Sequence, residues 1–441
     1  MCWRTRPNQN RTATGEWAVR KWPAGGKTMF RRLLAPITGL AVALTTSVAA
    51  VAAEPVKIAF IDPLSGPFAS TGIQGLAQYE YAADVLVNQK GGILGGRAFE
   101  IVGFDNKISP KESLIQLQVA IDQGIRFIAQ GNSSGVANAL TDAIRKHNRR
   151  NPDRQVLFLN YSAVDPALTN DKCNFWHFRF DANADIKMDA LTEVIAADDS
   201  VKRVYIIGQD YSFGKAVAAA AVSFLAEKRP DIEIVGNELH PIGKVKDFTP
   251  YARKIIDSGA QAIITGNWGA DMVNLGKAVI QAGFDGPIYT YYAAADGITQ
   301  TFGEDGVDRI RQVMEGQLNP APSDRAQAYI DGFKAKHPNT DVGQPRITNV
   351  IEMLARAIEA AGSADDMVAI AKALEGMEHD SIWGTRVYMR PQDHQAIQNV
   401  HIARHDRVPN DYDNSGFGMM VESTVEMAAM NSPTSCEIVR P

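Results

Sequence analysis

The sequence has few of the residues that bind transition metals. It contains three cysteines and eight histidines in 441 residues, and the histidines are scattered. No Cys-x-x-Cys pair and no matched His/Cys spacing occurs. A zinc site needs three or four such ligands at suitable spacing. We therefore expect neither a metal nor any other cofactor.

Clusters of basic residues are also missing, apart from the short stretch Arg-Lys-His-Asn-Arg-Arg at 145–150. The whole chain has 45 Lys and Arg against 50 Asp and Glu. Contacts to phosphate groups need clustered Lys and Arg, so we expect no nucleic-acid partner. We interpret 145–150 as the solvated end of a helix.

Long apolar runs are absent except near the N-terminus. Met29–Arg32 carries two arginines and precedes an apolar segment, which Pro36 interrupts and which ends in small residues at 51–53. This order is typical of a secretory signal peptide, with an uncleaved membrane anchor as the alternative. We predict cleavage before Glu54 and export to the periplasm, and we interpret residues 1–28 as an upstream extension.

Removal of the first 53 residues changes the charge and the cysteine count. They hold eight of the basic and one of the acidic side chains, so residues 54–441 carry a net charge of about −12. The remaining 388 residues exceed what one core normally serves, which predicts two domains. Cys173 and Cys436 are left as an even pair, and in an exported protein this predicts a disulfide, with two separate buried thiols as the alternative.

Strand-like apolar runs alternate with amphipathic helical stretches in two successive series. Near-continuous apolar strands between helices are typical of parallel sheets with both faces covered. We therefore predict an α/β fold with two doubly wound parallel-sheet lobes and a hinge. The apolar runs lie at 56–64, 99–105, 126–131 and 155–163, and then at 203–208, 232–239, 260–268 and 287–292. The expected division is 1–53 as N-terminal extension and signal peptide, 54–180 plus 318–385 as the first lobe, and 181–317 plus 386–441 as the second lobe and tail.

The short segments that follow these runs are rich in Ser, Asn, Tyr and Trp and nearly free of Lys and Arg. In open α/β sheets, ligands bind beyond the carboxyl ends of the strands. Hydroxyl, amide and aromatic groups gathered there predict a pocket for a small, partly aromatic or apolar ligand. The candidate lining residues are Phe68, Ser133, Ser134, Ser162, Val164, Tyr211, Phe213, Asn267, Trp268, Tyr291, Tyr292 and Asp296.

Several longer stretches follow one another in a characteristic order, among them IAFIDPLSGPFASTG (58–72), NYSAVDPALT (160–169) and DYSFGKAV (210–217). With these stretches the chain resembles the periplasmic solute-binding proteins of branched-chain amino-acid-type ABC transporters, which have the type I periplasmic binding fold. The resemblance covers essentially all of 54–441. It implies a monomer whose two lobes close on one small solute and which then docks on a membrane permease.

In amino-acid binders of this family, a serine hydroxyl and backbone N–H groups hold the ligand carboxylate. The matching residue is Ser134, with Ser133 just before it. A helix beginning there would offer unpaired N–H groups and a positive dipole end, both of which favour an anion. The alternative is that one of the two serines only caps the helix.

Three other positions depart from the family pattern. Val164 stands where amino-acid binders have a threonine, Phe213 where they have a tyrosine, and Ala293 where they have an acidic residue, with Asp296 three positions later. An ammonium group buried without its carboxylate partner would lose several kcal/mol. We therefore predict a carboxylate ligand without an ammonium, an aromatic acid of the benzoate or cinnamate kind. A branched-chain amino acid, an amide or urea is the alternative.

Two other kinds of function stay open. Gly131-Asn-Ser-Ser-Gly135 fits the Gly-x-Ser-x-Gly pattern of hydrolases with Ser133 as nucleophile, and His394, His401 and His405 occur later in the chain. The pattern is short and would sit on an unrelated strand order, so we expect no enzyme. A periplasmic sensor that reports its ligand to a membrane receptor would use the same closing lobes.

Overall fold

The computed structural model describes residues 54–294, 297–411, 414–430 and 432–441. The predicted signal peptide and the candidate Asp296 lie outside these residues. Among the helices of the described part, none has the length and apolar character needed to cross a membrane.

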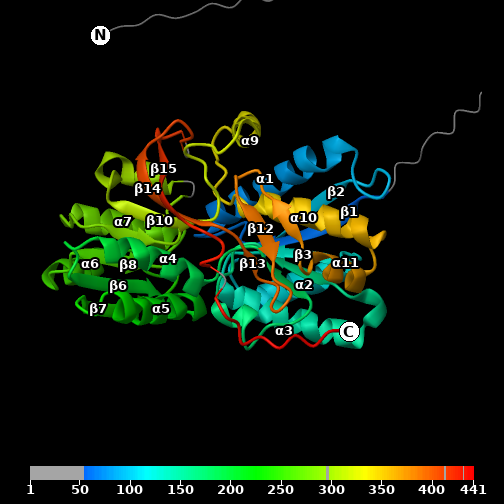
Figure 1. The fold of residues 1–441 in the computed structure, drawn as a ribbon, viewed down its shortest axis with the longest axis horizontal. Coiled ribbons are helices and arrows are strands. Elements are labelled where there is room, and N and C mark those ends of the chain that lie inside the picture. The colour runs from blue at the N-terminus through cyan, green and yellow to red at the C-terminus, as the bar shows by residue number, and fades with distance from the viewer. Residues whose placement is uncertain (1–53, 295–296, 412–413, 431) are drawn as a thin grey trace, which may run out of the picture. The chain divides into compact units, whose positions relative to one another are not determined.

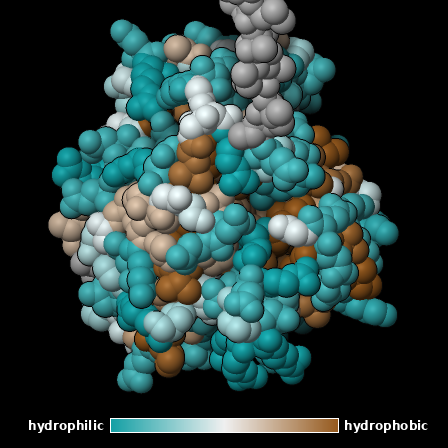
Figure 2. Space-filling model, turned by 90° about the vertical axis from the view of Figure 1, so that its right-hand side faces the viewer, coloured by the Kyte–Doolittle hydropathy of each residue, from teal (hydrophilic) through white to brown (hydrophobic). Residues whose placement is uncertain are grey.

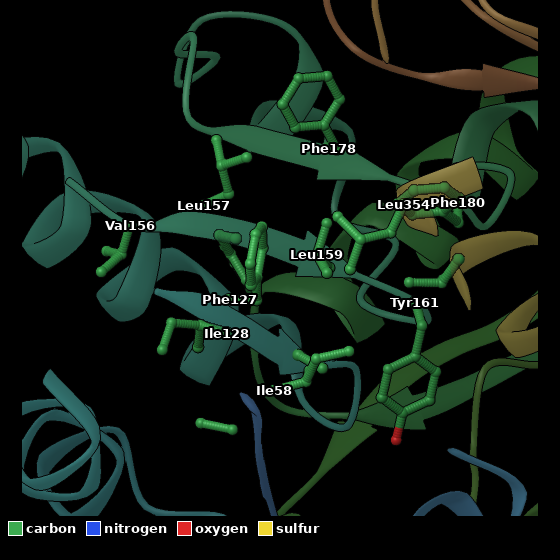
Figure 3. Packing of buried hydrophobic residues seen from close by; sticks show 14 of the residues in the cluster. Ile58, Phe127, Ile128, Val156, Leu157, Leu159, Tyr161, Phe178, Phe180 and Leu354 are labelled. Atoms are coloured by element: carbon green, nitrogen blue, oxygen red, sulfur yellow. The ribbon is translucent and has the colours of Figure 1, made fainter. Parts of the chain in front are cut away.

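The first lobe is built on a parallel sheet with the strand order β2-β1-β3-β4-β5. Every residue of β3 and β4 is buried, because helices cover both faces of the sheet (Figure 1). Figure 3 shows Phe127 of β3 and Leu159 of β4 packed in this core, with Tyr161 at the end of β4. The elements are β1 (Val56–Asp62), α1 (Ala69–Leu86), β2 (Phe99–Asp105), α2 (Pro110–Asp122), β3 (Phe127–Gln130), α3 (Ser134–Arg150), β4 (Leu157–Asn160), β5 (His177–Arg179), α10 (Arg346–Ala361) and α11 (Met367–Leu374).

The second lobe is built on a mixed sheet with the order β15-β14-β10-β9-β8-β6-β7. Its central strands are parallel, and the β14–β15 hairpin extends the sheet in the antiparallel direction. The elements are α4 (Ala184–Ala197), β6 (Arg203–Gln209), α5 (Ser212–Lys228), β7 (Glu233–His240), α6 (Thr249–Asp257), β8 (Ala262–Thr265), α7 (Ala270–Gln281), β9 (Ile288–Thr290), α8 (Ile298–Phe302), β10 (Ile310–Met314), α9 (Asp324–Lys336), β14 (Val400–Arg407) and β15 (Phe417–Val425).

Two parallel-sheet lobes confirm the predicted α/β fold class. A small third sheet has the order β11-β12-β13. Its β12 (Arg386–Met389) pairs with β11 (Glu378–Asp380) and β13 (Ala396–Ile397), and Val387 and Met389 lie in the core of the first lobe. The expected division after residue 385 therefore differs from the packing, because β12 turns back onto the segment that follows α11. It also differs at α9, which was expected in the first lobe but packs in a core cluster with Ile263 and Ile310 of the second.

The predicted disulfide is confirmed. Cys173 and Cys436 are bonded, with their Cα atoms 5.8 Å apart. Before this bond, Met430 of the C-terminal tail lies in the core of the second lobe, and Thr434 Oγ1 donates a hydrogen bond to the carbonyl of Thr169 at 2.7 Å. The tail therefore passes from the second lobe to the first and is fixed there by a covalent bond.

Figure 2 shows one side of the molecule as mostly hydrophilic, with separate hydrophobic patches. Among the described residues, exposed large apolar side chains include Leu114 and Ile115 of α2, which are 40% and 48% exposed. Scattered apolar residues of this kind are common on soluble proteins and by themselves identify no binding surface.

Candidate functional site

A small cavity of about 40 Å³ lies where loops of the two lobes meet. Loops after β3 and β4 line it from the first lobe, and loops after β6, β8 and β9 line it from the second. The structure brings nine of the twelve candidate residues together around this cavity. They are Ser133, Ser134, Ser162, Val164, Tyr211, Phe213, Trp268, Tyr291 and Tyr292.

The other three candidates do not line the cavity in the described part of the chain. Phe68 packs against the lining residue Trp268, with ring centroids 4.4 Å apart. Asn267 is fully buried, and its Oδ1 lies 3.0 Å from Nε2 of His240. Asn267 therefore makes its contact inside the second lobe. Asp296 is outside the described residues.

The loop between β3 and α3 is held by a buried carboxylate that sequence reasoning missed. Asp62 accepts hydrogen bonds from the backbone N–H groups of Gly131 and Asn132, at 3.1 and 3.0 Å, and from Tyr161 Oη at 2.6 Å. Burial raises the pKa of Asp62 to about 7, although these hydrogen bonds act to lower it. A Cβ at Gly131 would lie 2.6 Å from Cζ of Tyr161, so the close approach requires glycine.

Helix α3 begins at Ser134, and Ser133 precedes it with φ 79°. The Ser133 side chain makes no capping hydrogen bond, which removes the capping role considered for it from the sequence. The backbone N–H groups of Ser134 and Gly135 donate no hydrogen bond to any of the described residues. These groups and the positive end of the helix dipole are therefore available to an anion in the cavity.

Three hydroxyl groups around the cavity accept hydrogen bonds from protein N–H groups. Ser134 Oγ accepts a hydrogen bond from Asp165 N at 3.2 Å, Ser162 Oγ from Arg346 Nη2 at 2.7 Å, and Tyr211 Oη from Trp268 Nε1 at 2.8 Å. None of the three donates to an acceptor in the described part of the chain. Because each oxygen already accepts a protein N–H, its own hydrogen is left for a ligand.

The aromatic walls come from the second lobe. Phe213 meets Tyr291 edge-on, with ring centroids 5.4 Å apart, and lies 6.0 Å from the ring of Tyr292. Tyr291 Oη donates to the carbonyl of Ala184 at 2.8 Å, and Tyr292 Oη donates to the carbonyl of Ser162 at 3.3 Å. Since both hydroxyl groups are used by the protein, these tyrosines contribute mainly their rings to the cavity.

Two cations also line the cavity, Lys187 of α4 and Arg346 at the start of α10. Neither side chain lies in a segment that follows one of the strands expected from the sequence, so neither was predicted. A signal was present, because Arg346 stands at the start of the amphipathic segment 347–354, whose apolar residues include Ile347, Val350, Ile351 and Leu354. Thr71 was missed for the same reason; its Oγ1 is buried and has no hydrogen-bond partner among the described residues.

The Gly-x-Ser-x-Gly pattern does not assemble a catalytic triad among the described residues. His394 Nε2 lies 2.8 Å from Glu375, His401 Nδ1 lies 2.8 Å from Thr424 Oγ1, and His405 Nε2 contacts the carbonyl of Gly303. None of these histidines lines the cavity that contains Ser133. The pattern therefore reflects the β3–α3 turn and not a nucleophile.

Comparison with known proteins gives matches over most of the chain. A family described as "Periplasmic binding protein" matches residues 55–411. The Leu/Ile/Val-binding protein homolog 4 of Brucella melitensis is 30% identical over 406 residues, which is 89% of this chain and 95% of the relative. The closed structure of the leucine-, isoleucine-, valine-, threonine- and alanine-binding protein from Brucella ovis is 29% identical, with a TM-score of 0.76, and covers 88% of this chain and all of that one.

A more distant structure shares the fold. A solute-binding protein of an ABC transporter from Rhodopseudomonas palustris HaA2, in complex with p-hydroxybenzoic acid, is 19% identical with a TM-score of 0.72. The match covers 85% of this chain and 97% of that one. At this identity the match is evidence for the fold alone.

Proposed function

Since the chain belongs to the periplasmic binding protein family and is an ABC-transporter solute-binding protein, not an enzyme, we propose that its solute is a small carboxylic acid held between the two lobes. The solute would then pass to a membrane permease. The periplasmic location, the monomeric state and cleavage before Glu54 are parts of the same proposal. Because the solute contacts both lobes, it favours their closed arrangement.

The main support for this proposal is the set of hydrogen-bond donors around the cavity. The hydroxyl groups of Ser134, Ser162 and Tyr211 have hydrogens left for a ligand, and the first turn of α3 adds backbone N–H groups. A carboxylate has only acceptor oxygens and complements such a set. No Asp or Glu of the described residues lines the cavity.

Two classes of acid remain, and different observations favour them. A relative named as a Leu/Ile/Val-binding protein homolog aligns over 95% of its length, which makes a branched-chain amino acid the first candidate. The aromatic walls, and a lining without a carboxylate among the described residues, favour an aromatic acid as the second. An amino acid needs a partner for its ammonium group, and Asp296 is the nearest acidic residue in the sequence to the position where the family has one.

A thermal-shift screen of residues 54–441 separates these classes. The ligands are leucine, isoleucine, valine, benzoate, 4-hydroxybenzoate, cinnamate, the keto acid of leucine, acetamide and urea. A ligand at one hundred times its dissociation constant adds about 2.7 kcal/mol of stability, which raises the melting temperature by several degrees. We expect a response to at least one carboxylate and none to acetamide or urea; a response to the neutral compounds alone would reject the carboxylate proposal.

The variant Asp296→Asn distinguishes the two acids further. If the solute is a branched-chain amino acid, the variant loses most of the leucine response, because the ammonium group loses its charge partner. If the solute is an aromatic acid, the benzoate response is unchanged. Fluorescence of Trp268, compared between the native protein and Trp268→Phe, reports whether the ligand enters this cavity.

A further inference from the structure

Four buried charged side chains form one network beside the cavity, and each is at most 4% exposed. Lys187 Nζ lies 2.8 Å from Asp181 Oδ1 and 2.7 Å from Glu315 Oε1. Arg346 Nε lies 3.1 Å from Asp181 Oδ2, and its Nη1 lies 3.1 Å from Glu315 Oε2. With all four groups ionised, the network has two positive and two negative charges and is neutral overall.

The network joins the two lobes. Arg346 begins α10 of the first lobe, Lys187 is on α4 of the second lobe, and Glu315 follows β10 of the second lobe. Asp181 lies in the segment that joins β5 to α4. Loss of a charge from such a buried set leaves its partners uncompensated, so the charge state of the network affects both lobes.

The network also contacts Ser162, one of the residues proposed to bind the carboxylate of the solute. Arg346 Nη2 donates to Ser162 Oγ at 2.7 Å, which directs the Ser162 hydrogen away from the guanidinium. Lys187 Nζ lies 5.0 Å from the ring centroid of Tyr292, and Tyr292 Oη lies 3.4 Å from Asp181 Oδ2. A negative charge bound at Ser162 therefore lies one side chain away from the network, in a buried setting where charges interact strongly.

We propose that the network controls the affinity for the solute through one proton held by the Asp181–Glu315 carboxyl pair. When the pair holds the proton, the network has a net positive charge and attracts the carboxylate of the solute. When the pair loses the proton, the network is neutral and the attraction is lost. The inference rests on the proposed function, because it requires an anionic solute.

The surroundings of Asp181 support one retained proton at neutral pH. Charged and titratable groups face it from every element packed around it: Arg179 of β5, Lys187 of α4, Tyr292 after β9, Glu315 after β10 and Arg346 of α10. Burial raises the pKa of Asp181 above its usual range, with Glu315 acting in the same direction and Arg346 and Lys187 against it.

Glu315 differs from Asp181 in the balance of these effects. Burial acts to raise the pKa of Glu315, but the attraction of Lys187 and Arg346 outweighs it, so the pKa lies below its usual range. The pair therefore holds a proton to higher pH than an ordinary carboxyl group. A bound anion raises the pKa of the pair further, so binding takes up protons where the pair of the free protein has begun to lose its proton.

The test is calorimetric titration of residues 54–441 with benzoate and with leucine from pH 6 to pH 9. We expect the affinity of the probe that binds to fall about ten-fold or more between pH 7 and pH 9, as one nearby positive charge is lost. Asp181→Asn cannot release a proton, so its affinity stays at one value over this range. The matched control is Asp189→Asn on α4, the helix that carries Lys187. Asp189 bonds Lys228 and does not line the cavity, so this variant retains the native pH profile.

A second measurement needs no variant. At pH 8.5 the binding heat of the native protein depends on the ionisation enthalpy of the buffer, which shows uptake of a fraction of one proton, and at pH 6 it does not. A pH-independent affinity with buffer-independent heats overturns the inference but leaves the proposed function standing. Absence of binding for every carboxylate at every pH rejects the proposed function, and the inference with it.

Discussion

Replacing Ser134 or Ser162 by alanine weakens binding of the carboxylate ligand about 10- to 100-fold in each case, because a hydrogen bond to a charged group contributes about 1.5–3 kcal/mol. Each variant loses one hydroxyl whose hydrogen is left for the ligand. The measurement is calorimetric titration with the carboxylate that gives the strongest thermal shift. The two serines face one site, so we expect the effects of the double variant not to be additive.

The control for these variants is Ser113→Ala. Ser113 is a buried serine of the same lobe, on α2, and its hydroxyl donates to the carbonyl of Ser109, away from the cavity. This variant keeps the native affinity. If Ser134→Ala and Ser162→Ala also bind with native affinity while their melting temperatures are unchanged, the carboxylate does not lie against these hydroxyl groups.

Replacing Asp62 by alanine lowers the free energy of unfolding by about 3–5 kcal/mol, because three donors lose their acceptor in the core and each unpaired buried group costs about 1–3 kcal/mol. The donors are the N–H groups of Gly131 and Asn132 and the hydroxyl of Tyr161. The change also frees the loop that carries Ser133 and Ser134, so ligand affinity falls with stability. Urea unfolding and calorimetry measure the two effects.

Because of the raised pKa of Asp62, we also predict that the free energy of unfolding depends on pH. Its pKa is about 7 in the folded protein, above the unfolded value of about 3.9, so between these pH values only the folded state holds the proton. The contribution of Asp62 to stability is complete below about pH 4 and is lost as the pH rises through 7. Asp62→Asn removes this dependence, whereas Asp122→Ala, an exposed residue of α2, leaves it in place. An identical pH profile in Asp62→Asn would show that another group is responsible.

The parallel strands of both lobes could be predicted because a strand buried on both faces consists almost entirely of apolar residues. In β3 and β4 every residue is buried, which produces continuous apolar runs. The β14–β15 hairpin was not predicted as part of the second sheet, because Val400–Arg407 mixes apolar residues with two histidines and charged residues. The side chains of such a strand follow its tertiary surroundings, which a single sequence does not show.

The candidate site was predictable where its residues follow strands, since the carboxyl ends of parallel strands meet at one edge. Four predicted residues line the cavity because they follow strands: Ser134, Ser162, Tyr211 and Trp268. Asn267 also follows a strand but pairs with His240, which is 27 positions away in the sequence. Such pairings depend on tertiary packing and cannot be found from spacing.

The buried charges could not be predicted from local pattern. Asp181, Lys187, Glu315 and Arg346 come from four separate segments of the chain. Only the packing of the two lobes brings them within ion-pair distance. In the folded protein, each carboxyl group lies within ion-pair distance of both Lys187 and Arg346, which offsets the cost of burying the four groups together.

The central claim is that the cavity recognises the negative charge of a carboxylate. The most direct test is calorimetric titration of residues 54–441 at pH 7 with two matched pairs, leucine against leucinamide and benzoate against benzamide. We predict that at least one acid binds and that its amide, which lacks the charge and presents donors in place of an acceptor oxygen, binds about 100-fold more weakly or not at all. An amide that binds as tightly as its acid would contradict the claim.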